Sequence, residues 1–465
     1  MIRYISTRGD KTPKSFTDVL LAGLAPDGGL YVPTTWPTID MDDLSGLAYP
    51  DIAYRIIHPF VGGDIPDGDL RDMITETYEN NFNHTAAAPL VQIAPSAWAM
   101  ELFHGPTLAF KDYALQLLGR LFDYTLEKRG QRVTIVGATS GDTGSAAIEA
   151  CKDCKHIDIF ILHPEGRTSE VQRRQMTTVD SPNVFNIALQ GHFDDCQNIV
   201  KTLFGDAAFR DEMHLSAVNS INWARIMAQI VYYFTAAVAL NRTGNDKIRF
   251  AVPTGNFGNV YAGYCAMKMG LPVERLVIGS NRNDILTRFF ETGSMTAGIV
   301  EPSLSPSMDI QVSSNFERFL FDLLDRDADS IRACMEQFKK AGEYTLTEKH
   351  MKEARDVFEA YRCSDDQTLT VMSRCYKETG GYMIDPHTAV GLFAAWSSER
   401  HPKTPVVALA CAHPAKFPDA VEKATGIRPG LPPHLADLYD RKEIVTVLPN
   451  DPEVIKGFIK EKRNA

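Results

Sequence analysis

The chain has 465 residues, which exceeds the length at which a single hydrophobic core stops growing, so we expect several domains with a large buried interior. Its hydrophobic content of 44% and charged content of 23% are typical of a globular protein. The formal net charge of -11 excludes a basic surface of the kind that neutralises nucleic-acid phosphates, although a small anion needs only local positive potential. We therefore expect no nucleic-acid partner.

The sequence has no signal peptide at its start and no long apolar run further on. These features predict a cytoplasmic protein that does not bind membranes. Its eight cysteines are scattered and do not form a disulfide framework. Cys151 and Cys154 have the spacing of a redox or zinc pair, but no second pair accompanies them, and no His-Glu-x-x-His motif occurs. We expect no bound metal.

Residues 1–95 are rich in turns and predict a mostly helical leading module that ends near Pro89 and Pro95. After this module, strand and helix patterns alternate, which predicts an α/β fold with parallel-rich sheets covered by helices on both faces. Residues 291–315 are rich in Ser, Pro and Gly and predict a long loop. The strand candidates are 132–136, 157–162, 184–189, 247–252, 275–278 and 406–410, and the helix candidates begin at Lys111 or cover 145–151, 221–240, 260–268 and 452–462.

One lysine opens a predicted helix directly after an apolar stretch. Residues 104–112 read HGPTLAFKD and place Lys111 at this point. A desolvated lysine amine can form an imine with a carbonyl cofactor, whereas a lysine at the start of a helix is more commonly a solvated surface charge. An aldehyde cofactor that also carries a phosphate needs an anion site elsewhere in the chain.

The loop at residues 253–259 (PTGNFGN) offers such a site, because it follows a predicted strand and opens a helix. Unpaired backbone amides and the positive end of the helix would meet there. The alternative is a plain glycine turn. The loop matches neither a Walker A motif nor Gly-x-Gly-x-x-Gly, so the sequence does not support nucleotide binding.

Two further polar segments stand before predicted helices. Residues 137–144 (GATSGDTG) present hydroxyls and amides that could hold a carboxylate, and a serine nucleophile is the alternative, although Gly-x-Ser-x-Gly is not matched. Residues 217–225 (AVNSINWAR) combine amides, a hydroxyl and a guanidinium suited to a phosphate. The alternative for this segment is a helix N-cap followed by a solvated arginine.

These four motifs, together with residues 412–417 (AHPAKF), resemble threonine synthase. The resemblance covers nearly the whole chain, from residues 4–8 (YISTR) and 27–31 (DGGLY) onward, and is closest to the longer bacterial and fungal branch. Several unusual motifs in a fixed order are much more specific than any one of them.

The resemblance implies a lyase that depends on pyridoxal 5'-phosphate and has the tryptophan-synthase-like fold of type II. Such an enzyme converts a small-molecule substrate, O-phospho-L-homoserine, and water to L-threonine and inorganic phosphate, the last step of threonine biosynthesis. It implies an N-terminal module at 1–95, a catalytic region at 96–430 with two lobes and the cofactor between them, and a C-terminal extension at 431–465. A monomer or weak homodimer is expected.

The resemblance also implies the site residues. Lys111 matches the catalytic lysine that carries the cofactor. The residues implied for the cofactor phosphate are Gly255, Asn256, Phe257, Gly258 and Asn259, and those implied for the substrate are Thr139, Ser140, Gly141, Asp142, Thr143, Asn219, Ser220, Asn222 and Arg225. One position departs from the family, because Cys411 stands where a threonine usually faces the pyridine nitrogen. A thiol is a weak partner, so either Cys411 holds the ring loosely or a neighbour takes the role.

Three alternatives stay open on the sequence alone. The same scaffold could release phosphate and 2-oxobutyrate as a phospho-lyase, which analysis of the products distinguishes. It could be a binder that keeps the fold without the cofactor, although the retained Lys111 speaks against this. A nucleotide-binding protein that uses the loop around Gly255 is the third.

Overall fold

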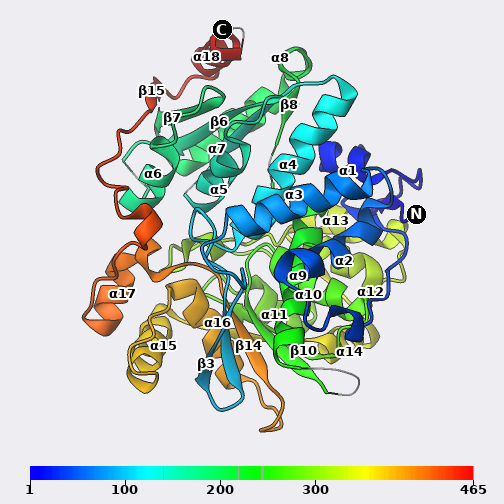
Figure 1. Cartoon of the computed structure of the whole chain (residues 1–465). Coiled ribbons are helices and arrows are strands. Elements are labelled where there is room, and N and C mark those ends of the chain that lie inside the picture. Colours follow the sequence, from blue (N-terminus) through cyan, green and yellow to red (C-terminus); the bar gives the residue numbers. More distant parts are fainter. Residues whose placement is uncertain (140, 167, 218, 242–245, 464–465) are drawn as a thin grey trace. The chain divides into compact units, whose positions relative to one another are not determined.

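The structure is a computed structural model that describes residues 1–139, 141–166, 168–217, 219–241 and 246–463. The chain divides into two compact units, each built from separate parts of the sequence (Figure 1). The large unit contains residues 1–110 and 220–429, and the small unit contains residues 111–219 and 430–465. The module boundaries at 95 and 430 and the position of a cofactor between two lobes stay predictions. Of the helices described, none is both long and apolar enough to cross a membrane.

The small unit is built on a parallel sheet with strand order β15-β7-β6-β5-β8. Ile187 on β7 packs with the apolar side chains of α7, whereas its neighbour Asn186 donates to Met176 O on α6 (2.9 Å). Because successive strand residues point to opposite faces, α6 and α7 cover opposite faces, as predicted. The elements are α4 (Lys111–Arg129), β5 (Val133–Ala138), α5 (Asp142–Cys151), β6 (Ile157–Pro164), α6 (Glu170–Thr177), β7 (Val184–Gln190), α7 (Phe193–Gly205), α8 (Ala207–Met213), β8 (Leu215–Ser216), a 3-10 turn (Pro433–Leu435), β15 (Thr446–Pro449) and α18 (Pro452–Arg463).

The large unit is built on a sheet with strand order β13-β10-β9-β14-β4-β3, parallel except for β3. A Cβ on Gly263 of α10 would lie 2.9 Å from Leu276 Cδ2, and one on Gly279 would lie 2.7 Å from Val390 O on α16. Residues 276 and 279 of β10 are an odd number of positions apart, so they face opposite sides of the sheet. Helices α10 and α16 therefore pack closely on opposite faces. The sheet elements are β3 (Leu90–Ala94), β4 (Ala97–Glu101), β9 (Ile248–Pro253), β10 (Val273–Ser280), β13 (Phe358–Arg362) and β14 (Val406–Ala410).

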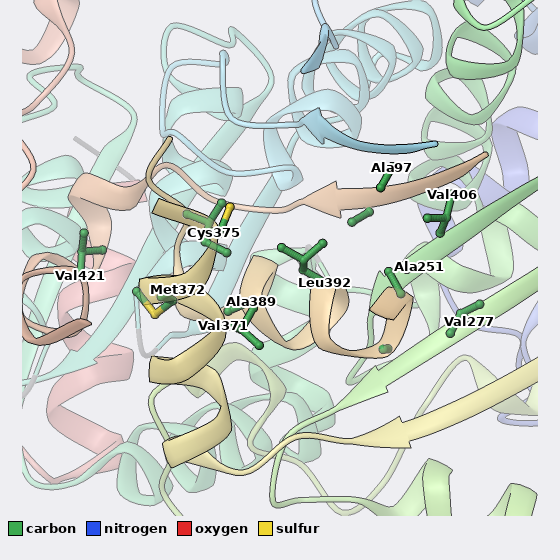
Figure 2. Close-up of a cluster of buried hydrophobic side chains, with 14 residues drawn as sticks. Ala97, Ala251, Val277, Val371, Met372, Cys375, Ala389, Leu392, Val406 and Val421 are labelled. Carbon is green, nitrogen blue, oxygen red and sulfur yellow. The ribbon is translucent and has the colours of Figure 1, made fainter. Parts of the chain in front are cut away.

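The helices of the large unit bury an apolar core against this sheet. Figure 2 shows one part of it, a cluster in which Leu392 of α16 lies between Met372 and Cys375 of α15 and Ala251 and Val406 of the strands. The helices are α1 (Phe16–Ala22), α2 (Tyr49–Val61), α3 (Asp67–Asn80), α9 (Trp223–Ala239), α10 (Gly258–Lys268), α11 (Ile285–Thr292), α12 (Phe316–Leu323), α13 (Ala328–Ala341), α14 (Glu348–Val357), α15 (Asp365–Glu378), α16 (Pro386–Ser397) and α17 (Pro418–Thr425), with 3-10 turns at Asp42–Leu44, Pro306–Met308 and Pro414–Lys416.

The first part of the chain is mostly helical, as predicted, and it anchors the start of α9. The hydroxyl of Tyr4 on β1 (Tyr4–Ser6) donates to Phe60 O (2.7 Å) and accepts from Trp223 Nε1 (3.1 Å). Both rings are fully buried. Strand β2 (Tyr31–Pro33) pairs with β1. These contacts fix the end of α9 at which the predicted substrate residues stand.

The segment 291–315 differs in part from the predicted long loop. It includes β11 (Ser294–Thr296), which pairs with β12 (Glu343–Thr345), and the 3-10 turn Pro306–Met308. The sequence showed no alternating pattern here because a three-residue strand is too short to produce one. The hairpin of β3 and β4 was also missed, since its turn at Pro95 was interpreted as a domain boundary.

Candidate active site

Lys111 is the first residue of α4 and is only 8% exposed. Its Nζ lies 3.6 Å from Asp142 Oδ2, and Asp142 Oδ1 accepts from Gln172 Nε2 on α6 (2.8 Å). The positive end of a helix disfavours an ammonium group. A buried ammonium at this position therefore requires a carboxylate as its neighbour. The alternative of a solvated surface lysine is therefore wrong.

The loop between β5 and α5 is closed by its own side chains. Thr139 is 3% exposed, and its Oγ1 accepts from the amides of Gly141 (3.0 Å) and Gly144 (2.9 Å). Gly144 has to be glycine because a Cβ there would lie 2.4 Å from Thr139 Cγ2. Two amides of this loop therefore serve the fold of the loop itself.

The rest of this loop leaves only a few groups for a ligand. Gly141 has a φ of 148°, and a Cβ there would meet Gln172 Cδ at 2.5 Å. Thr143 is partly exposed, whereas Asp142 is buried next to Lys111. Ser140 lies outside the described residues. The substrate role of residues 139–143 stays a prediction.

The loop between β9 and α10 is open. Among the described residues, none of the backbone amides of residues 255–259 donates to a protein acceptor. The first amides of a helix have no helical partner, so these donors are available to an anion at the positive end of α10. A Cβ on Gly255 would lie 3.3 Å from Met308 Cα, which shows how closely another segment lines the loop.

Phe257 holds the conformation of this open loop. Its φ of 62° is left-handed, which costs a non-glycine residue on the order of 1 kcal/mol or more. Its ring packs against Phe316 at 5.0 Å and against Phe358 at 5.4 Å, and it is 1% exposed. This burial offsets the backbone strain and holds the loop in its conformation.

Asn259 belongs to the loop, but its side chain is occupied elsewhere. Its Oδ1 accepts from the hydroxyls of Tyr232 (2.5 Å) and Tyr233 (3.1 Å). Its Nδ2 lies 4.0 Å from Cys411 Sγ. Only the backbone amide of Asn259 is therefore available to an anion, and its side-chain amide is the neighbour of Cys411.

Cys411 follows β14 and is 5% exposed. Its amide donates to Thr388 Oγ1 on α16 (3.2 Å), and the Thr388 hydroxyl donates to Asp385. The hydrogen of the Thr388 hydroxyl is therefore already used in the bond to Asp385. The side-chain amide of Asn259 is a described neighbour of the Cys411 thiol at this position.

Arg225 stands in the first turn of α9 and is 4% exposed. Among the described residues, no hydrogen-bond partner lies near its Nε or Nη1. Burial lowers the pKa of this guanidinium to about 10, so it still carries its charge at neutral pH. The expected alternative of a solvated arginine is wrong. A buried cation without a partner is costly unless an anion joins it.

The residues before Arg225 differ in what they offer. Asn222 is the N-cap of α9, because its Oδ1 accepts from Ala224 N (3.0 Å), and its Nδ2 donates to Leu20 O (2.8 Å). The N-cap alternative is therefore confirmed for Asn222. Asn219 and Ser220 are partly exposed, at the point where the chain passes from the small unit to the large one.

The motif at residues 412–417 holds the segment that leads to Lys111. Lys416 is fully buried and donates to Thr107 O (2.7 Å). The amide of Phe110 donates to Cys411 O (2.8 Å), and His413 N donates to Leu108 O (3.0 Å). In the sequence, this motif contributed to the family resemblance, and no structural role was predicted for it. A lysine among apolar residues was the signal for a buried structural role.

A second group of residues was missed because it lies in the serine-rich loop. Ser313 Oγ donates to Gly255 O (2.7 Å), and Ser314 Oγ donates to Asn256 Oδ1 (3.3 Å). Asn315 and Arg318 follow them and are fully buried. A loop composition rich in Ser and Asn gave no spacing from which these contacts could be predicted.

The comparisons with known proteins first define a class. The family model described as "Pyridoxal-phosphate dependent enzyme" matches residues 85–341, which include Lys111 and the loop at 253–259. The chain is thus a pyridoxal-phosphate-dependent enzyme of fold type II. The models described as "Threonine synthase N terminus" and "Threonine synthase, C-terminal" match residues 3–78 and 388–459. The chain belongs to the threonine synthase family.

Relatives and solved structures agree with this membership over the full length. A threonine synthase of Pseudomonas aeruginosa is 52% identical over 467 residues, covering 100% of this chain and 99% of the relative. The threonine synthase of Saccharomyces cerevisiae is 40% identical, and the match covers 99% of this chain and 98% of the relative. The pyridoxal-phosphate-bound threonine synthase of Brucella melitensis has a TM-score of 0.98 at 49% identity, covering 100% of both chains. The yeast structure has a TM-score of 0.95 at 39% identity, covering 99% of each.

The residues of the structure fit this cofactor. Pyridoxal 5'-phosphate has an aldehyde, which needs an amine, and a phosphate, which needs donors. Lys111 supplies a buried amine, and the loop at 255–259 supplies amides that have no protein acceptor in the described part of the chain. A Cβ on Gly255 would come within 3.3 Å of Met308 Cα, so a side chain here would crowd the neighbouring segment.

Proposed function

We propose that this chain converts O-phospho-L-homoserine and water to L-threonine and inorganic phosphate. One observation carries the proposal, namely that the large unit offers two separate places for an anion. The first is the open amide loop at 255–259, and the second is the buried guanidinium of Arg225. The reaction needs two such places, because both the cofactor and the substrate carry a phosphate.

The first place suits the phosphate of the cofactor. Gly255, Asn256, Phe257, Gly258 and Asn259 would hold it through backbone amides at the N-terminus of α10. Cys411 and the side-chain amide of Asn259 are the groups proposed to face the pyridine nitrogen. When bound, pyridoxal phosphate supplies an electron sink for negative charge at the α-carbon of an amino acid.

Lys111 is the proposed base. Its amine would take the proton from the α-carbon of the substrate and return protons at the β-carbon. Asp142 lies 3.6 Å away and stabilises the ammonium form that follows each proton uptake. Gln172 holds the other carboxylate oxygen, which fixes the direction of Asp142.

Arg225 is the proposed partner of the phosphate that leaves the substrate. A leaving dianion needs positive charge that is already in place, and Arg225 is a desolvated cation without a protein partner among the described residues. Ser220 and Asn219 would add uncharged donors. Asn222 uses its side-chain oxygen to cap α9 and one amide hydrogen to bind Leu20 O. Its second amide hydrogen is the one proposed to bind the phosphate.

The carboxylate of the substrate is proposed to bind the loop after β5. Thr143 is the partly exposed hydroxyl of this loop, and it stands in the first turn of α5, where the helix end favours an anion. Thr139, Gly141 and Asp142 would shape this place rather than contact the substrate, because their polar groups are bonded within the small unit. Ser140 stays part of the proposal on sequence grounds.

We further propose that the protein acts in the cytoplasm as a monomer or weak homodimer. The assembly state follows only from the family resemblance. Sedimentation of the purified protein at several concentrations would test the assembly state.

The test of the function is a balance of products. The purified protein with cofactor is incubated with O-phospho-L-homoserine, and threonine and inorganic phosphate are measured in the same samples. We expect equal amounts of both throughout the reaction. Phosphate accompanied by 2-oxobutyrate in place of threonine would identify a phospho-lyase, and absence of both products would reject the reaction altogether.

A further inference from the structure

We infer that Asn315, oriented by Arg318, is a positioning residue that aims the amides of the 255–259 loop and at the same time fixes Ser220. The inference rests on the proposed function, because it concerns how the residues proposed for the two phosphates are held. It goes beyond that function by linking the two places. Its consequence is that the affinities for cofactor and substrate change together when Asn315 is altered.

The contacts of Asn315 join two segments that are distant in sequence. Its Nδ2 donates to Asn256 O (3.0 Å) and to Ser220 O (3.1 Å), and its backbone amide donates to Asn256 O (3.1 Å). The side chain is fully buried, so water does not compete for these bonds. A single amide group thus bridges the proposed cofactor loop and the segment that leads to Arg225.

Holding a carbonyl also aims the next amide. In a trans peptide the C=O and the following N–H lie in one plane and point in opposite directions. Asn315 holds Asn256 O and so directs the amide of Phe257, and Ser313 holds Gly255 O and so directs the amide of Asn256. Both amides are among those without a protein acceptor in the described chain. Ser313 and Asn315 therefore orient the open loop from behind.

Arg318 sets the orientation of Asn315. Its Nη1 donates to Asn315 Oδ1, its Nε donates to Tyr31 O (2.9 Å), and its Nη2 donates to Ile221 O (2.5 Å). An arginine can only donate, so the oxygen of Asn315 must face it and the NH2 group must face the two carbonyls. The bond to Ile221 O fixes the residue next to Ser220 in the same way. All these residues belong to the large unit.

Ser313 offers a matched control within the same loop. Both Ser313 and Asn315 hold a carbonyl of the 255–259 loop, but only Asn315 also holds Ser220. A purely structural role would lower stability in both variants without a selective change in affinities. A positioning role predicts two affected constants for Asn315 and one for Ser313.

The test uses Asn315→Ser, which removes the NH2 group without adding charge, and Ser313→Ala. Each apoprotein is titrated with pyridoxal 5'-phosphate and with pyridoxine 5'-phosphate, which has no aldehyde and therefore reports on the phosphate loop alone. The KM for O-phospho-L-homoserine is measured on the reconstituted enzyme. For Asn315→Ser we expect both dissociation constants and the KM to rise about fivefold, the effect of one lost hydrogen bond at each carbonyl. For Ser313→Ala we expect only the dissociation constants to rise.

Arg318→Lys is the second variant, because it keeps the positive charge but loses the planar fork. It should raise the same constants as Asn315→Ser, even if the latter folds poorly. An unchanged KM in both folded variants, or unchanged cofactor affinity, would overturn the inference. Failure of the wild-type protein to make threonine would instead reject the proposed function, while the titrations would still decide whether Asn315 orients the loop.

Discussion

The loop after β5 and the loop after β9 both lead from a buried strand into a helix, yet they differ in what their backbone amides contact. In the loop after β5, Thr139 accepts from two amides, and Asp142 is held by Gln172. In the loop after β9, the amides of residues 255–259 have no protein acceptor in the described chain. The first loop is closed by its own side chains, whereas the second is held open by Ser313 and Asn315.

Two buried cations, Lys111 and Arg225, show a similar difference. Lys111 has a carboxylate oxygen at 3.6 Å, whereas Arg225 has no hydrogen-bond partner for Nε or Nη1 among the described residues. A paired lysine can exchange protons with its surroundings, and an unpaired buried arginine stabilises an anion that arrives. The comparison supports the proposed roles, in which Lys111 of the small unit exchanges protons and Arg225 of the large unit meets a phosphate.

The largest expected effect is that of Lys111→Ala, which tests the first half of the comparison. Removing the base should lower kcat/KM by at least about a thousandfold. Steady-state kinetics measure this, and borohydride reduction followed by peptide mapping should find the cofactor on the peptide of Lys111 only in the wild type. Lys128→Ala is the matched control, since Lys128 stands in the last turn of the same helix and is exposed. A label on another residue would contradict the assignment.

Arg225→Met should change activity and stability in opposite directions. Loss of the cation should lower kcat/KM for O-phospho-L-homoserine by about 10- to 100-fold. The apoprotein should become more stable by about 1–3 kcal/mol, because an unpaired buried charge is replaced by an apolar side chain. Urea unfolding and kinetics measure the two effects.

The control for Arg225 is Gln229→Met. Gln229 lies one helical turn further along α9 and is 3% exposed. It should leave kcat/KM near the wild-type value. If Arg225→Met destabilised the apoprotein, the guanidinium would have a protein partner and the comparison with Lys111 would fail.

Thr139→Val should break the closed loop. The amides of Gly141 and Gly144 would lose their acceptor, which should lower the free energy of unfolding by about 2 kcal/mol. Thr139→Ser keeps the hydroxyl and should stay close to the wild type. Urea unfolding of the two apoproteins measures the difference. Equal stability of both variants would mean that the loop does not depend on this oxygen.

The smallest expected effect is on the pH dependence of stability. It concerns a histidine in the strand beside the closed loop. His163 of β6 is 2% exposed, and burial lowers its pKa from the usual 6.5. Below 6.5 the unfolded chain takes up a proton at this residue while the folded chain does not, so stability falls as the pH falls through this window. His163→Leu should flatten this slope between about pH 5 and 7. An unchanged slope in unfolding experiments would show that His163 takes up its proton at the same pH in the folded and the unfolded chain.

Much of the fold could be predicted from the sequence. The strands at 157–162, 184–189 and 406–410 and the helix that begins at Lys111 are confirmed, because long buried strands and amphipathic helices produce local periodicity. The three-residue strands β11 and β12 could not be predicted, since three residues give no period and the two strands are distant in sequence. Strand β3 was missed because the turn at Pro95, which joins it to β4, was interpreted as a domain boundary. The motifs for Lys111 and the loop at 253–259 were visible for the same reason as the long elements, namely that each is contiguous.

The sequence by itself determined the type of fold, the family resemblance and the residue types of the site. Only the tertiary structure decided which of those residues have partners. It showed that Arg225 is buried with no hydrogen-bond partner for Nε or Nη1 among the residues described, that Asn222 caps a helix, and that Thr139 closes its own loop. It also brought Asn315 and Arg318 to Asn256 and Ser220. Contacts of this kind depend on the packing of segments far apart in the chain, for which a local pattern carries no signal.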